Sequence, residues 1–249
     1  MKRIWIVLLL PFLFFGLQPL SAQTSTQFSG WFAEVARVEL KKRYSLRIES
    51  QFRSANEMQG LQQWLIRLGL NYDIRRNQIL TIGYGYFSTF KTVSGTSGYV
   101  PENRIWEQYV FEPAFSANGH YIKFHNRVRL EQRFIGQPND DNGQLVTSDY
   151  AFAQRIRYLF RSIMPFSKTT ADFKRGTYIT LQEELYFNFG DLSPVNGHYF
   201  DQNRIYLALG YRFSSIIDWE IGYMNQFIQN NGSAKTSNNI LQLATNIRL

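Results

Sequence analysis

The amino-acid sequence predicts an all-β protein, a closed antiparallel transmembrane β-barrel of roughly 10 to 12 strands. Three observations support this prediction: an N-terminal export signal, long segments in which polar and apolar residues alternate, and no later apolar helix. Aromatic residues make up 16% of the chain and charged residues 18%, a composition that suits the pleated surface of a sheet. The sequence contains no cysteine, which excludes disulfides and thiolate chemistry.

Residues 1–22 have the layout of a secretory signal peptide. Two basic residues precede an apolar run, residues 4–17, and a small-residue segment then ends at Ala22. We expect cleavage after Ala22, which leaves residues 23–249 as a single outer-membrane barrel domain. An uncleaved one-helix anchor is the alternative, but Pro11 and the shortness of the apolar run argue against it.

Eleven segments of the mature chain are predicted to be β-strands. They cover residues 28–38, 44–55, 61–74, 78–90, 102–115, 121–134, 150–163, 177–190, 200–213, 216–228 and 238–249. Because successive side chains of a strand point to opposite faces, their two-residue alternation predicts a lipid-facing side and a lumen-facing side. Most segments are also long enough for a tilted strand to cross a membrane, which takes roughly 9 to 11 residues.

Two features of the predicted strands do not fit a simple barrel. One is the number of strands, and the other is the short first link, residues 39–43, where the first hairpin should end outside. A barrel with both termini on the periplasmic side has an even number of strands, so twelve strands are favoured over the eleven segments found. Four short links are expected at one rim, and long links rich in Gly, Ser, Asn and Asp are expected at the other. The short links are residues 39–43, 73–77, 116–120 and 214–218, and the long ones are residues 91–103, 135–149, 190–199 and 229–238.

The polar faces of the predicted strands carry many charged residues, which we expect to line the lumen. These candidates are Arg47, Glu49, Arg53, Arg67, Lys123, His125, Arg127, Arg129, Glu131, Arg133, Arg155 and Arg157, and Arg161 shares the same kind of face. One interpretation is a basic constriction that favours anions in a water-filled pore. The other is a network of Arg, Glu and Gln side chains that closes a narrow lumen, and the sequence is compatible with both.

No catalytic residue, metal site or cofactor is predicted. His125 lacks a hydroxyl-bearing residue two positions away on its own strand, where a nucleophile could share its face. Glu183 and Glu184 are adjacent in a strand and point to opposite faces, so they cannot converge on a sugar. In this register Glu184 faces the lumen and Glu183 faces lipid, which is unfavourable away from a rim. Residues 138–143 have the composition of a calcium-binding loop but lack the ligand spacing of an EF-hand.

Several strand-end phrases carry a resemblance to a known family. They are GWFAEVARVELKKRYSLRIESQFR, NRIWEQYVFEP, KFHNRVRLEQRF, YITLQEELYFNFG and FDQNRIYLALGYRF, and the similarity covers about residues 28–249. In these phrases the chain resembles the outer-membrane β-barrel family catalogued as domain of unknown function 2490, which is common in Bacteroidetes-type bacteria. The resemblance implies a barrel in the outer membrane. It implies no reaction, because the family has no established activity.

These features predict an integral protein of the Gram-negative outer membrane without enzymatic activity. Its expected role is structural or passive transport, the latter pore-like with a preference for anions. Expected partners are outer-membrane lipids, lipopolysaccharide, small anionic solutes and, during biogenesis, the barrel-assembly machinery. Nucleic acid is not expected although the full chain has a net charge of +8, because an exported protein meets anionic solutes and head groups instead. A lipid-modifying outer-membrane enzyme and a soluble periplasmic β-protein that binds an apolar ligand are the alternatives.

Overall fold

The computed structural model describes residues 24–117, 119–169 and 173–249, and the predicted signal peptide lies outside these ranges. The strands are β1 (Thr24–Lys41), β2 (Tyr44–Ser54), β3 (Leu61–Arg75), β4 (Gln78–Val93), β5 (Thr96–Phe111), β6 (Ala114–Ala117), β7 (His120–Asp141), β8 (Gln144–Pro165), β9 (Gly176–Phe189), β10 (Phe200–Arg212), β11 (Ile217–Gln229) and β12 (Lys235–Arg248). One 3-10 turn, η1 (Asn56–Met58), lies between β2 and β3. No helix in the described ranges is long and apolar enough to cross a membrane.

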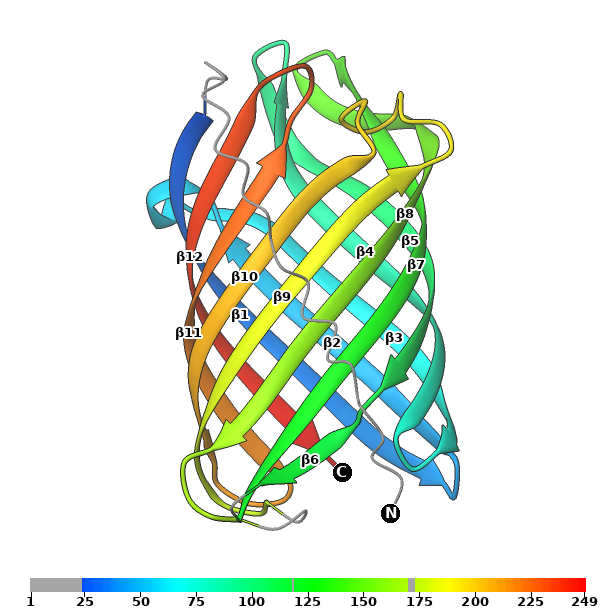
Figure 1. Ribbon diagram of the computed structural model, residues 1–249. Coiled ribbons are helices and arrows are strands. Elements are labelled where there is room, and N and C mark those ends of the chain that lie inside the picture. The colour runs from blue at the N-terminus through cyan, green and yellow to red at the C-terminus, as the bar shows by residue number, and fades with distance from the viewer. Residues whose placement is uncertain (1–23, 118, 170–172) are drawn as a thin grey trace.

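The strands form one sheet that closes on itself (Figure 1). Along the sheet the order is β5-β4-β3-β2-β1-β12-β11-β10-β9-β8-β7-β6, and an additional pairing of β5 with β7 closes the ring. The short strand β6 pairs only with β7 and lies outside that ring. The barrel proper therefore has 11 strands, and the predicted closed all-β barrel is confirmed.

An odd number of strands requires one parallel pair, which is the seam between β1 and β12. Thr24 pairs with Lys235 and Arg37 pairs with Arg248, so the first and last strands run in the same direction. Each of the eleven predicted segments coincides with one barrel strand, and a count of twelve is reached only by including β6. An even number of strands is required only of a barrel whose first and last strands begin and end at one rim. In Figure 1, β1 begins at the upper rim and the C-terminus lies at the lower rim.

Two links that were predicted to be long loops are instead strand hairpins. The β4–β5 and β7–β8 pairs continue to two-residue turns at Ser94–Gly95 and Asn142–Gly143. All four turn residues have positive φ, between 51° and 88°, as the turns favoured between twisted strands require. The four links predicted to be short all lie at the lower rim and the four predicted to be long all lie at the upper rim, but the difference in length between the two rims is smaller than predicted. The upper rim carries these tight turns beside the long link 190–199, and the lower rim carries both the tight β1–β2 turn and the link after β8.

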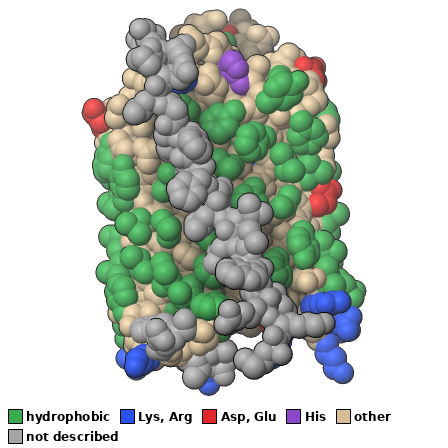
Figure 2. Space-filling view, viewed as in Figure 1, with side chains coloured by type: hydrophobic (Ala, Val, Ile, Leu, Met, Phe, Trp, Pro, Cys, Tyr) green, Lys and Arg blue, Asp and Glu red, His purple; other side chains and the backbone are tan. Residues whose placement is uncertain are grey.

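The barrel wall is apolar outside and polar inside. Each of the 11 barrel strands exposes large hydrophobic side chains, including Phe32, Ile66, Ile82, Leu207 and Ile221, and Figure 2 shows them spread over the side wall. Lys and Arg side chains gather at the lower rim in the same view. The exposed basic residues of the two tight turns there are Lys41, Lys42, Arg43, Arg75 and Arg76.

Two of the carboxylates on the outer face are each held by an amide of a neighbouring strand. Glu183 alternates with the buried Glu184, as predicted, and accepts a hydrogen bond from the Asn203 amide at 3.1 Å. Glu107 accepts one from the Gln132 amide at 3.1 Å. A hydrogen bond of this kind lowers the unfavourable free energy of placing a polar group on an apolar wall.

Glycines in the strands make room for aromatic rings inside the barrel. A Cβ atom on Gly83 would lie 2.3 Å from the indole of Trp106, and one on Gly69 would lie 2.6 Å from it. The Tyr178 ring lies against Gly210 in the same way, at 2.3 Å from the Cβ position. Because any side chain at these positions would collide with a ring, the strand glycines let large aromatic residues lie flat across a narrow interior.

The parallel seam gives a direct test of the topology. Thr26 and Ser237 face each other across β1 and β12, and neighbouring strands are close enough for a disulfide to form. We expect the Thr26→Cys/Ser237→Cys variant to cross-link on mild oxidation, detected as a mobility shift on a non-reducing gel. Thr245, whose partner is Glu34, lies about 26 Å further along the seam. A cross-link between Thr26→Cys and Thr245→Cys in its place would indicate an antiparallel seam.

Candidate functional site

The interior of the barrel is filled by side chains from every strand. Each of the 11 barrel strands contributes at least one inward side chain with less than 9% of its surface exposed. In chain order, one from each strand, these are Trp31, Glu49, Leu65, Phe87, Trp106, Arg129, Leu159, Tyr186, Tyr206, Met224 and Ile240. Such low exposure means that water-sized molecules barely reach these groups, so the interior resembles a protein core.

This core has an apolar part and a charged part. The apolar part is a cluster from β1 and β10–β12 that contains Trp31, Tyr206, Ala208, Met224 and Ile240. The charged part comes mainly from β2 to β9, and in it Glu49, Glu102, Glu131 and Glu184 are each shared by more than one arginine. Guanidinium groups also lie over aromatic rings there, for example Arg129 at 4.3 Å from the Trp106 ring centroid.

Glu131 is the most heavily shared carboxylate of the charged part. Its oxygens accept hydrogen bonds from Arg157 at 2.5 Å, from Arg155 at 2.6 Å and from Arg104 at 3.3 Å. The side chain is only 1% exposed. Because a buried ion is stable only when it is paired and hydrogen-bonded, these three arginines and Glu131 depend on one another.

Two further carboxylates extend the network around the barrel. Glu184 accepts hydrogen bonds from Arg127 and Arg157, both at 2.6 Å, and from the Tyr186 hydroxyl at 2.6 Å. Glu49 accepts from Arg47 at 2.5 Å, from Arg129 at 3.4 Å and also from Arg67. Arg157 contacts both Glu184 and Glu131, so it joins two of these clusters.

Most of the predicted lumen residues lie in this network. They are Arg47, Glu49, Arg67, Arg127, Arg129, Glu131, Arg155, Arg157 and Arg161. Arg133 pairs with Glu102 at 2.6 Å, whereas Arg53 reaches the lumen and donates its hydrogen bonds to glutamine amide oxygens. Lys123 and His125 lie apart from the network, near the lower rim.

Several residues of the network were not among the sequence candidates. Glu102, Arg104, Asp201, Arg204 and Glu220 are buried or half-buried inside the barrel. The signal for Glu102 and Arg104 was present, because residues 102–115 alternate and these two share a face with Trp106. Asp201 lies next to a long link, where no alternation distinguishes a lumen position.

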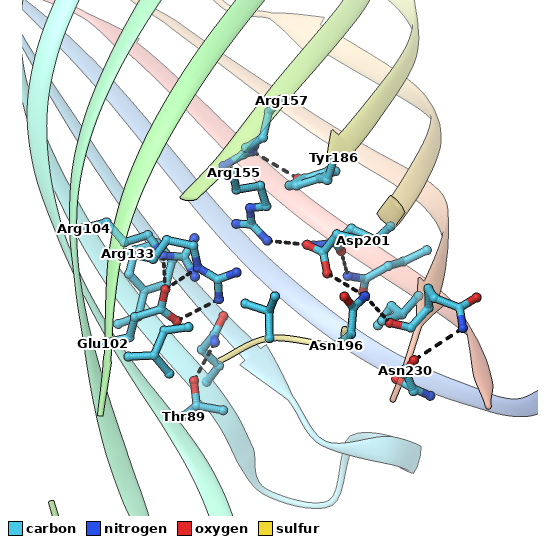
Figure 3. A pocket seen from close by; sticks show the side chains of 18 of the residues that line it. Thr89, Glu102, Arg104, Arg133, Arg155, Arg157, Tyr186, Asn196, Asp201 and Asn230 are labelled. Atoms are coloured by element: carbon cyan, nitrogen blue, oxygen red, sulfur yellow. Dashed lines mark hydrogen bonds and ion pairs between the residues drawn. The ribbon is translucent and has the colours of Figure 1, made fainter. Parts of the chain in front are cut away.

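A cavity of about 770 Å³ opens above the filled region, toward the rim that carries the 190–199 and 230–234 links. We call it the vestibule; Figure 3 shows part of its lining. Its basic lining residues are Arg53, Arg67, Lys91, Arg104, Arg133, Arg155, Arg157 and Arg204, and its acidic ones are Glu102 and Asp201. The vestibule wall is therefore strongly cationic, which favours anions inside it.

The 190–199 link folds into the mouth of the vestibule. Pro194, Val195 and Asn196 belong to the cavity wall. The Asn196 amide donates to the Gln229 carbonyl oxygen at 2.7 Å, and its Oδ1 accepts from the Asn188 amide at 3.1 Å. These hydrogen bonds join the link to β9 and β11 and hold it across part of the opening.

A separate cluster lies at the lower rim, around Glu112 between β5 and β6. Its carboxylate contacts Lys123 Nζ at 2.6 Å and His125 Nδ1 at 2.8 Å. Burial alone would raise the pKa of Glu112, but the hydrogen bond with His125 and the charge of Lys123 hold this pKa well below its usual range. No group of three or more potential metal ligands occurs in the described ranges.

The fold and its interior define a class, closed β-barrels whose lumen is filled by an ionic network. Among known families, residues 28–238 match the model of the family described as protein of unknown function (DUF2490). The chain belongs to this family, which confirms the resemblance seen in the sequence. No match was found among curated proteins or solved structures.

The shared carboxylate makes a clear prediction about stability. The Glu131→Gln substitution removes the negative charge that three buried guanidinium groups share, so we expect a loss of about 3–5 kcal/mol in the free energy of unfolding. Urea unfolding in detergent, followed by tryptophan fluorescence, measures this change. Glu57→Gln, at an exposed position in η1, is the matched control and should change stability little. Equal midpoints for the two variants would contradict the role of Glu131.

The cluster at the lower rim predicts a pH-dependent effect. Because the folded-state pKa of Glu112 is depressed, its contribution is complete above the unfolded-state pKa, about 4.3, and declines as the pH falls below it. We expect Glu112→Gln to lower the free energy of unfolding by roughly 1–3 kcal/mol at pH 7. The difference from the parent protein should shrink between pH 5 and pH 3 in urea unfolding. A difference that stays constant over this range would exclude an ionised Glu112 as its source.

Proposed function

We propose that this chain is an integral β-barrel of the outer membrane whose lumen is closed to diffusion and whose vestibule receives anionic solutes. The observation that carries the proposal is the distribution of polarity. Every barrel strand presents large apolar side chains outward, and the ion pairs lie inside. A continuous apolar wall of this size is unfavourable in water and favourable in hydrocarbon.

The filled interior supports a closed barrel more than an open pore. Arg129 and Tyr206 are 0% exposed, and Glu131 is 1% exposed. A hydrated ion could pass only if the ion pairs around Glu131 separated, which is costly in a region of low dielectric constant. The cationic vestibule above this region can still bind anions. The expected preference for anions would therefore apply to binding in the vestibule and not to passage through the barrel.

The alternative functions have less support from the geometry. A soluble carrier of apolar ligands needs an apolar cavity, but the vestibule is lined by charged and amide side chains. A lipid-modifying enzyme needs a nucleophile beside its histidine, and the His125 ring instead contacts the Glu112 carboxylate. We therefore propose a non-enzymatic role.

The membrane partners follow from the outer surface. The apolar wall would contact lipid chains, and the basic turns at the lower rim would contact anionic head groups. Insertion of a closed barrel into the outer membrane would depend on the barrel-assembly machinery, and lipopolysaccharide would surround the protein in the outer leaflet.

Fractionation and conductance test the proposal together. We expect the protein in the outer-membrane fraction, with heat-modifiable migration on gels, and no steady conductance in planar bilayers. Trp106→Ala/Arg129→Ala removes a stacked pair from the filled interior and should open measurable conductance. Ile82→Ala, on the exposed wall, should remain closed. Recovery in the soluble periplasm, or steady conductance of the parent protein, would refute the proposal.

A further inference from the structure

Two arginines of the vestibule differ from the others in having no acidic partner. Arg104, Arg133, Arg155 and Arg157 pair with carboxylates at 2.5–2.6 Å. In the described part of the chain, Arg53 and Arg204 have no carboxylate oxygen within 4.0 Å. The hydrogen-bond acceptors of these two guanidinium groups are neutral glutamine amides.

The two arginines converge on one aromatic ring. The Arg53 guanidinium carbon lies 4.2 Å from the Trp31 ring centroid, and that of Arg204 lies 5.0 Å from the same centroid. Arg53 comes from β2, beside Trp31, whereas Arg204 reaches the ring from β10 on another part of the wall. Two cations are thus held near each other by a shared indole.

Both arginines also have an N–H donor that makes no hydrogen bond within the described residues. The Nε atoms of Arg53 and Arg204 are buried and have no hydrogen-bond partner among the described residues. Arg204 is only 8% exposed, yet it forms part of the cavity wall. An unpaired buried charge is unfavourable, and two of them close together repel each other, so the arrangement is incomplete without an anion.

We propose that Arg53 and Arg204, held on Trp31, form a binding site for the phosphate or sulfate group of a solute that enters the vestibule. The inference rests on the anion-receiving vestibule of the proposed function and specifies where and what it binds. Guanidinium groups present several N–H donors in a fixed plane, a geometry that matches tetrahedral oxyanions. The glutamines that orient the two arginines leave both positive charges uncompensated.

The size and lining of the vestibule indicate the rest of the ligand. A volume of about 770 Å³ is within the range of sites for whole small molecules and exceeds the needs of a bare oxyanion. Amide side chains around the two arginines, including Gln63, Gln226 and Asn196, offer donors and acceptors for hydroxyl groups. The ligand class is therefore a hydroxyl-rich phosphate or sulfate ester.

Calorimetric titration of the detergent-solubilised barrel at constant ionic strength tests the site. The titrants are inorganic phosphate, inorganic sulfate, glucose 6-phosphate, glucose and chloride. We expect glucose 6-phosphate to bind more tightly than the two inorganic oxyanions, and glucose and chloride to give no saturable heat. Arg53→Gln and Arg204→Gln should each weaken binding about ten- to hundredfold. Lys91→Gln removes a charge from the same cavity wall and should weaken it much less.

The stability of the ligand-free variants separates a binding site from a structural role. Because Arg204 has no carboxylate partner, Arg204→Gln should leave the unfolding midpoint unchanged or raise it. Arg155→Gln should lower the midpoint, because Arg155 pairs with Glu131 and Asp201, both at 2.6 Å. If Arg204→Gln lowered the midpoint as much as Arg155→Gln, the arginine would be structural and the proposed site would be wrong.

Two further outcomes would contradict the inference and leave the proposed function unaffected. One is saturable binding that survives both Arg53→Gln and Arg204→Gln, which would place the anion elsewhere. The other is no saturable binding of phosphate, sulfate or glucose 6-phosphate by a barrel that is membrane-inserted and non-conducting. Failure of the proposed function would instead appear in fractionation and conductance, which do not depend on these two arginines.

Discussion

The interior of this barrel depends on the sharing of a few buried carboxylates among a larger number of arginines. Glu49, Glu131 and Glu184 each accept hydrogen bonds from two or three guanidinium groups. In a space that excludes water, each of these charges needs a partner within hydrogen-bonding distance. Because the arginines outnumber the acids, the carboxylates become common points that join nearby strands, and the contact of Arg129 with Glu49 also joins β7 to β2.

The excess of arginines becomes visible where the charged part of the core meets the apolar part. Trp31 belongs to the apolar cluster, and it is also the ring on which Arg53 and Arg204 converge. The apolar cluster supplies no acidic side chain at this boundary, so two cations there are held by an indole and by amides. The vestibule opens beside them, which explains why the uncompensated charge is accessible from the cavity.

Much of the barrel could be predicted from the sequence, because alternation directly encodes the two faces of a strand. All eleven segments were found, and Glu184 and the outward-facing Glu183 were assigned to the faces that they occupy. The tight turns at Ser94 and Asn142 were missed because a polar strand extension has the composition of a loop. Closure of the sheet with an odd number of strands leaves no local signal in the sequence, because it depends on which distant strands pair.

The state of the lumen could not be predicted for a different physical reason. A water-filled pore and a filled core require the same inward polar residues, and they differ only in how side chains fill the available volume. That volume depends on rings such as Trp106 lying against Gly83, a contact between separate strands that periodicity does not reveal. The unpaired state of Arg204 likewise depends on the positions of all surrounding carboxylates.

The parallel seam has a consequence for how the chain can be rearranged. It joins segments separated by 211 residues, as in the hydrogen bond between Ser25 and Thr236, so the ring can close only after all its hairpins exist. The start of β1 and the end of β12 lie at opposite rims. A short peptide therefore cannot connect the two ends of the chain as it could in an even-stranded barrel. New termini introduced by circular permutation would therefore require a linker as long as the barrel is tall.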